Sequence, residues 1–244
     1  METIERNRFK DALWFGKDCK MLIGGSGGIG SWLAFFLTRA GFSTTVYDFD
    51  TVEAHNLGGQ LFKVSDVGKP KVDALTDVIE EFNGYDVNIT TYNLRLTHET
   101  DLSTITRYYH GPVFYISAFD NMEARKILFS KFKLHQSRYD YPAYFIDGRL
   151  LMEQMRIYCF NQKQEKLMND YETNHLFDDS EVIDASCTMK QVSHTAAMIA
   201  SHMTAFITNA ITNMYEFNRE EVFKVPYIWD YLIPNNLITE THTL

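Results

Sequence analysis

The stretch Ile23-Gly24-Gly25-Ser26-Gly27-Gly28-Ile29-Gly30 decides the fold of this chain. It contains the pattern GxGxxG, which is typical of nucleotide-binding sites when it follows a strand and opens a helix. In that setting Gly25 permits a tight turn and Gly27 lets a phosphate approach the backbone. Gly30 lets the following helix lie close to the sheet. The stretch therefore predicts a phosphate-binding turn.

The residues on both sides of this turn provide the expected context. Cys19–Ile23 is a short apolar run that indicates a buried strand, and Ile29–Ala40 has the pattern of an apolar helix. Ser43–Tyr47 is rich in β-branched residues and is predicted as the second strand. Asp48 follows that strand, where a carboxylate can accept hydrogen bonds from ribose hydroxyls. The region from Cys19 to Lys71 is thus predicted to bind a nucleotide, the alternative being a Rossmann-like domain that has lost its ligand.

Strands and helices continue to alternate beyond this unit. Helices are predicted over Pro70–Phe82 and Asn121–Phe132, and strands over Val87–Tyr92, Val113–Ser117 and Ala143–Ile146. This alternation predicts an α/β fold with a Rossmann-like, doubly wound, mainly parallel sheet and helices on both faces.

The pattern changes after Asp147. Leu150–Phe160 is long and extended and predicts an antiparallel extension of the sheet. We expect a polar loop over Asn161–Asp184, then a long, weakly charged helix over about Ser193–Asn218. An irregular tail follows, with Pro226, Trp229 and Pro234. Since no linker is apparent, we expect one domain over 1–244, with an N-terminal helical segment (1–18), a core (19–148) and an extension (149–244).

Composition narrows the classes of function. Among 244 residues, 45% are hydrophobic and the formal charge is −9, which argues against a broad nucleic-acid-binding surface. Three widely spaced cysteines do not form a disulfide framework. The charged start METIERNRFKD lacks the apolar core that is typical of a signal peptide, so none is expected, and no apolar run is long enough to span a bilayer. We therefore expect a cytoplasmic protein with no membrane or nucleic-acid partner.

Three further motifs follow the glycine-rich turn in order. Asp48–Gln60 is DFDTVEAHNLGGQ, Asp66–Lys71 is DVGKPK, and Ser117–Arg125 is SAFDNMEAR. From about Met21 to Leu128 the chain resembles the ThiF/MoeB/E1-like (ubiquitin-activating-type) adenylyltransferase family. That family's motifs are D-x-D-x-V-x-x-x-N-L-x-R-Q, then D-x-G-x-P-K, then D-[NS]-x-x-x-R. From Asp147 onward the resemblance is looser.

The resemblance implies ATP-dependent adenylation of a carboxylate, commonly the C-terminus of a ubiquitin-like protein or a peptide. It implies ATP and Mg²⁺ as cofactors. Asp48 would hold the ribose, Asn56, Gln60 and Lys71 would face the phosphates, and Asp120 would hold Mg²⁺. A carboxylate is already ionised at neutral pH, so this site needs positive charge rather than a base. Lys71, Mg²⁺ and backbone N–H groups would supply that charge.

The sequence departs from the family pattern at Gly59, where the family has an arginine. Losing a preorganised cation from such a site costs a few kcal/mol of barrier. We consider Arg149 a candidate substitute, in a predicted turn after a strand, with a surface ion pair as the alternative. The family also places an N-terminal arginine in the partner subunit's ATP site, and Arg6 and Arg8 both match that position.

Cys187 lies in the segment ASCTMKQ, just before the last predicted helix. Relatives of the E1 type that transfer the activated carboxyl group to sulfur carry a cysteine in a comparable loop. A cysteine near a helix N-terminus and a lysine can act as a nucleophile. The alternative is a packing residue at a loop–helix junction, which is also the role expected of Cys19 and Cys159.

Three functions follow from these patterns. The first is an E1-like adenylyltransferase, and the second is an impaired nucleotide-binding partner subunit, which Gly59 would explain. The third is an NAD-dependent oxidoreductase, which the glycine-rich turn and Asp48 permit. Asn56, Gln60 and Asp120 have no evident use in hydride transfer. The resemblance also implies a homodimer or a heterodimer with another E1-like subunit.

Overall fold

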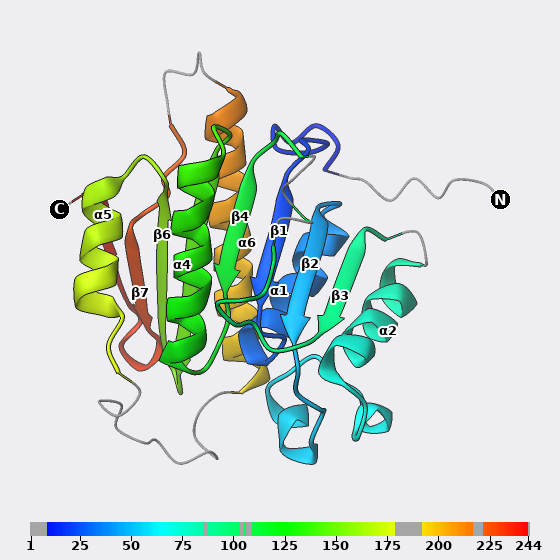
Figure 1. The fold of residues 1–244 in the computed structure, drawn as a ribbon. Coiled ribbons are helices and arrows are strands. Elements are labelled where there is room, and N and C mark those ends of the chain that lie inside the picture. Colours follow the sequence, from blue (N-terminus) through cyan, green and yellow to red (C-terminus); the bar gives the residue numbers. More distant parts are fainter. Residues whose placement is uncertain are drawn as a thin grey trace.

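The computed structural model describes residues 9–84, 87–102, 105, 109–178, 192–216 and 222–243. An eight-stranded sheet runs through it in the order β3-β2-β1-β4-β5-β6-β7-β8, with helices on both faces (Figure 1). The strands are β1 (Lys20–Gly24), β2 (Ser43–Asp48), β3 (Ile89–Asn93), β4 (Val113–Ser117), β5 (Ala143–Leu151), β6 (Gln154–Asn161), β7 (Ile228–Leu232) and β8 (Leu237–Thr241). The helices are α1 (Gly28–Arg39), α2 (Lys71–Asn83), α4 (Met122–Arg138), α5 (Glu165–Asp170) and α6 (Ser193–Tyr215).

Strands β3, β2, β1, β4 and β5 are parallel, as predicted. Gly24 and Ser117 are the last residues of β1 and β4, and Asp147 lies beside Ser117 in the middle of β5. The doubly wound arrangement is confirmed, because α1 and α6 cover one face of the sheet while α4 covers the other (Figure 1). The carboxyl edge of the parallel strands is therefore the edge that carries the predicted nucleotide-binding turn.

The antiparallel extension is also confirmed, and it is larger than predicted. β5 continues to Leu151, turns at Met152 and pairs with β6. The predicted turn at Asp147-Gly148-Arg149 is wrong, because these residues lie within β5 and pair with β6. Hydrogen bonds to the next strand keep this part of the chain extended beyond the core.

The predicted irregular C-terminal tail is wrong. The tail forms β7 and β8, which continue the antiparallel part of the sheet. Pro226 precedes β7, and Pro234 lies in the short turn η6 (Ile233–Asn235), so both prolines lie outside the strands. Trp229 is buried on β7, and its ring lies 4.3 Å from the ring of His202 on α6.

The predicted polar loop Asn161–Asp184 is wrong in its first half. It contains α5 and the π-helical turn η3 (Tyr171–His175). Three residues of this segment are buried against the aromatic core on the α4 side of the sheet: Leu167, Met168 and Tyr171. Burial of these three side chains anchors the segment to the sheet.

The two terminal helix predictions also change. The described part of the N-terminal segment, 9–17, forms successive turns rather than a helix, with Ala12 N–H bonded to Phe9 O and Phe15 N–H bonded to Ala12 O. Trp14 packs on Phe42 there, with ring centroids 5.7 Å apart. Helix α6 ends at Tyr215. Among the described residues, no helix is both long and apolar enough to cross a membrane.

Candidate nucleotide site

The glycine-rich turn is shaped by close backbone contacts. Gly25 has a φ of +91°, and its N–H donates to the Tyr47 carbonyl over 2.8 Å. A Cβ on Gly30 would collide with the Gly25 carbonyl oxygen, so only glycine lets α1 begin this close to the turn. A Cβ on Gly27 would meet the Gln60 Nε2 at an ordinary contact distance of 3.9 Å, so the backbone is far less crowded there than at Gly30. A phosphate could approach the backbone at this position, beside the N-terminus of α1.

Asp48 joins this turn to the end of β2. Its Oδ2 accepts hydrogen bonds from the Ser26 N–H (2.6 Å) and the Ser26 Oγ (2.9 Å). Its Oδ1 accepts from the Asp50 N–H at 2.8 Å. The residue is only 8% exposed, so its carboxylate holds both loops at the sheet edge.

Lys71 lies at the same edge because the chain folds back between β2 and α2. Its Nζ lies 2.9 Å from the Asp50 Oδ2, and its N–H donates to the Asp50 carbonyl over 2.8 Å. Lys71 is buried at the first position of α2, while Asp50 is exposed. Lys71 is therefore a cation at the sheet edge whose carboxylate partner faces solvent.

Asn56 and Gln60 lie on the segment between β2 and α2, which contacts α1. The Asn56 Oδ1 accepts from the Glu53 N–H at 2.8 Å and so caps the turn η1 (Ala54–Gly58). Gln60 is 9% exposed, and its buried Oε1 has no hydrogen-bond partner among the described residues. Its Nε2, a hydrogen-bond donor, is the side-chain atom that lies near Gly27, at 3.9 Å from the position of a Cβ there.

Gly59 lies in this same segment. The Trp32 indole N–H on α1 donates to the Gly59 carbonyl at 3.2 Å, and the Leu61 N–H donates to the Ser31 Oγ at 3.0 Å. At the position where the family has an arginine, the backbone of this chain is therefore fixed against α1 by two hydrogen bonds.

Asp120 lies between β4 and α4 and is exposed. The Asn121 side chain caps α4 by accepting from the Ala124 N–H at 2.9 Å, and its Nδ2 lies 3.3 Å from the Asp120 Oδ1. The described residues contain no cluster of three or more His, Cys, Asp or Glu that could hold a metal ion. Mg²⁺ is commonly held by one or two carboxylates together with substrate phosphates, and Asp120 fits that mode.

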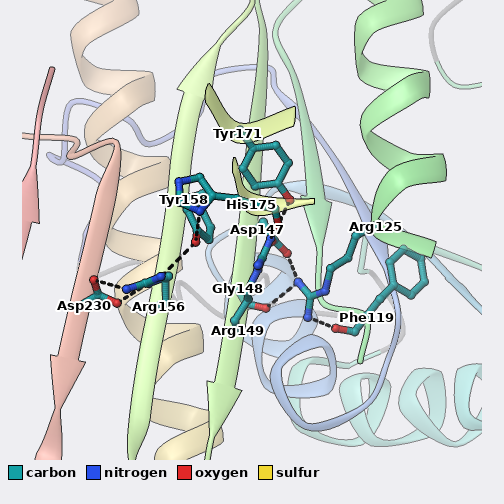
Figure 2. Close-up of polar contacts among 10 residues, drawn as sticks. All are labelled: Phe119, Arg125, Asp147, Gly148, Arg149, Arg156, Tyr158, Tyr171, His175 and Asp230. Atoms are coloured by element: carbon teal, nitrogen blue, oxygen red, sulfur yellow. Dashed lines mark hydrogen bonds and ion pairs between the residues drawn. The ribbon is translucent and has the colours of Figure 1, made fainter. Parts of the chain in front are cut away.

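A buried polar cluster lies next to this loop, centred on Asp147 (Figure 2). The Asp147 carboxylate is fully buried and accepts hydrogen bonds from Arg125, from the Arg149 Nε at 2.7 Å and from the Tyr171 hydroxyl at 2.9 Å. Burial alone would raise the pKa of Asp147, but the two guanidinium groups outweigh it and hold that pKa below its usual value. Asp147 was not among the residues predicted to be functional.

Arg149 is engaged inside the cluster. Besides Asp147, its Nη2 donates to the His175 carbonyl at 2.8 Å, and its guanidinium lies 4.7 Å from the centre of the Tyr158 ring. Its side chain is 16% exposed, so the alternative of a surface ion pair is wrong. A role as substitute for the missing arginine stays a prediction.

The fold thus brings most predicted site residues to one sheet edge, through the ends of β1, β2 and β4. They are Gly25, Gly27, Gly30, Asp48, Asn56, Gln60, Lys71 and Asp120. Cys187, Arg6 and Arg8 lie outside the described residues.

The sequence of this chain is similar to those of known proteins. The ThiF family model matches residues 16–240. The chain is 34% identical over 122 residues to ubiquitin-like modifier-activating enzyme 5 of Oryza sativa subsp. japonica, covering 46% of this chain and 29% of the relative. It is 34% identical over 114 residues to molybdopterin-synthase adenylyltransferase of Salmonella typhimurium, covering 46% and 44%. The matches span less than half the length of these relatives.

Solved structures share the fold at low sequence identity. The crystal structure of E. coli MccB with ATP aligns with a TM-score of 0.60 and 17% identity, over 96% of this chain and 66% of that chain. The structure of MccB with AMPCPP and MccA has a TM-score of 0.63 and 16% identity, over 96% and 65%. That of PaaA has a TM-score of 0.61 and 20% identity, over 94% and 65%.

Proposed function

Because the chain belongs to the ThiF family, we propose that it catalyses the ATP-dependent adenylation of a carboxylate on a ubiquitin-like protein or a peptide. The observation that carries this proposal is the space beside Gly27 at the N-terminus of α1, where the side-chain nitrogen of Gln60, a hydrogen-bond donor, lies 3.9 Å from the position of a Cβ on Gly27. Lys71 and Asp120 lie at the same sheet edge. A phosphate chain in that space would meet backbone N–H groups, a cation and a carboxylate suited to Mg²⁺.

The proposed reaction follows from these groups. A carboxylate oxygen of the substrate attacks the α-phosphorus of ATP, the bond to the bridging oxygen breaks, and pyrophosphate leaves with its electron pair. Lys71 and the N-terminus of α1 stabilise the negative charge on the phosphate oxygens, and Asp48 orients the ribose. Mg²⁺ held at Asp120 supplies further charge neutralisation when bound.

The names of relatives support the substrate class. One is an activating enzyme for ubiquitin-like modifiers, and one neighbouring structure contains MccB together with MccA. By analogy with these proteins, we propose a protein or peptide carboxylate as the substrate of this chain. We further propose a homodimer or a heterodimer with another E1-like subunit, in the cytoplasm.

ATP–pyrophosphate exchange tests this proposal. The purified chain is incubated with ATP, Mg²⁺, labelled pyrophosphate and small proteins or peptides with free C-termini. Exchange that depends on one of these carboxylates is expected. Thermal shifts with ATP·Mg²⁺ and with NAD are measured in parallel, and stabilisation by NAD but not by ATP would contradict the proposal.

Gly59 favours a second candidate, a nucleotide-binding partner subunit without catalysis. Its φ of −132° lies outside the left-handed region that favours glycine. If the missing cation limits the reaction, Gly59→Arg raises the exchange rate by about tenfold or more. Gly58→Arg adds the same charge at the exposed neighbouring position and serves as the control. An equal gain in both variants would mean that the position of the charge has no importance.

We further propose that the activated carboxyl group is transferred from the adenylate to the thiol of Cys187. Cys187→Ala is expected to leave adenylate formation intact and to abolish a thioester with the substrate. Non-reducing gels with and without thiol, together with pyrophosphate exchange, separate the two steps. A thioester that persists in this variant would remove Cys187 from the reaction.

A further inference from the structure

Every oxygen of the buried Asp147 carboxylate is used. Its Oδ1 accepts from Arg125, and its Oδ2 accepts from both the Arg149 Nε and the Tyr171 hydroxyl (Figure 2). The three donors come from α4, β5 and η3, so the carboxylate is fixed from several directions. Because three donors fix this carboxylate in one position, it can hold each of its partners in a single orientation.

Arg125 is the partner held in this way. One guanidinium nitrogen, Nη1, donates to Asp147 and lies 3.3 Å from the Gly148 carbonyl oxygen. The other, Nη2, donates to the carbonyl of Phe119. The planar guanidinium fixes the angle between its donors, so orienting one side of it orients the other. Asp147 thereby sets the direction in which Arg125 holds Phe119.

Phe119 connects this arrangement to the nucleotide site. Its peptide carbonyl directly precedes Asp120 in the chain. Its ring packs against Gly24, where a Cβ would collide with it, and a Cβ on Gly25 would lie 3.3 Å from the same ring. Arg125 holds the carbonyl of Phe119 and not its ring, so it acts on the approach of Asp120, while ring packing supports the glycine-rich turn.

We propose that Asp147 is a positioning residue which, through Arg125 and the Phe119 carbonyl, holds Asp120 where a metal–nucleotide complex binds. The inference rests on the proposed function, because it assigns Asp120 to the metal. Asp147 itself does not touch the nucleotide. Partners that orient a metal ligand typically change metal affinity by about 10–100-fold when they are removed.

The test compares Asp147→Asn with Asp230→Asn. Asp230 forms a two-bond ion pair with Arg156 on β6, at 2.5 and 2.9 Å, and has no described contact with the Asp120 loop. ATP affinity is measured by calorimetry with and without Mg²⁺. Mg²⁺ is expected to increase the affinity of the wild-type chain for ATP. In Asp147→Asn this increase is expected to be about tenfold smaller, with the affinity for free ATP unchanged. Asp230→Asn is expected to retain the full enhancement.

Amide hydrogen exchange of residues 118–124 measures the loop directly. It is expected to be faster in Asp147→Asn and unchanged in Asp230→Asn. If Asp147→Asn does not fold, Arg125→Lys replaces it, because a lysine keeps the charge but cannot bind both partners in the fork geometry. Combining Asp147→Asn with Asp120→Ala is expected to cause no further loss of Mg²⁺ enhancement beyond Asp120→Ala alone.

Unchanged loop exchange or a full Mg²⁺ enhancement in Asp147→Asn would overturn the inference. Additive losses in the double variant would overturn it as well. If the wild-type chain shows no enhancement by Mg²⁺, both the metal assignment and this inference are wrong. If Mg²⁺ enhancement is normal but no carboxylate supports pyrophosphate exchange, only the proposed reaction is wrong.

Discussion

Asp120→Ala is expected to lower ATP–pyrophosphate exchange at least about 100-fold and to leave the fold intact. The loss follows because Asp120 is the carboxylate proposed to hold Mg²⁺ at the phosphates. The fold is expected to survive because the side chain is exposed and its described contact is a single 3.3 Å hydrogen bond from Asn121. Surface substitutions of this kind change stability by about 0.5 kcal/mol or less.

The control for this variant lies at the other end of α4. Asp140 is exposed just beyond the helix, and Asp140→Ala makes the same chemical change far from the nucleotide edge. It should retain full exchange activity. Asp120→Ala should also keep its affinity for ATP measured without Mg²⁺, because the glycine-rich turn is unchanged. If exchange persists in Asp120→Ala, that residue does not hold the metal.

Gly30→Ala is expected to abolish measurable nucleotide binding and to lower the free energy of unfolding by about 1–3 kcal/mol. The added methyl group would collide with the Gly25 carbonyl oxygen. This neighbour is backbone, so it cannot rotate away as a flexible side chain would. Either α1 or the turn must shift, and both together form the proposed phosphate site.

Gly58→Ala separates this effect from a general loss of glycine. A Cβ on Gly58 would meet no atom within 4 Å, and the residue lies in the helical turn η1. We expect normal nucleotide binding and little change in stability there. Calorimetric titration with ATP and chemical denaturation measure both properties. Equal damage in the two variants would show that crowding at Gly30 is not the cause.

The elements that sequence analysis predicted well are those with local signals. The strand before the glycine-rich turn, the helix after it and the strand Val113–Ser117 are apolar runs with clear ends, and the structure confirms them. β7 and β8 were missed because prolines flank them, and strand pairing with β6 is what keeps them extended. α5 was missed because Leu167 and Met168 are too few to give a helical period.

In the candidate site too, the residues with a local sequence signal were predicted and those without one were missed. Asp48, Lys71 and Asp120 were found because each belongs to a motif with fixed spacing. Asp147 was missed because its partner Arg125 lies 22 residues earlier, and nothing in the sequence shows that α4 and β5 bring them together. A carboxylate at the end of a predicted buried parallel strand was the only signal available.

The two described cysteines determine how the protein will respond to thiol reagents. Cys19 and Cys159 are nearly inaccessible, and burial raises the pKa of each thiol to about 12. Alkylation requires a thiolate that the reagent can reach, so neither residue will be modified while the protein stays folded. Of the three cysteines in the sequence, only Cys187 remains. Any iodoacetamide or maleimide adduct on the native chain can therefore be assigned to Cys187 without removing the other thiols.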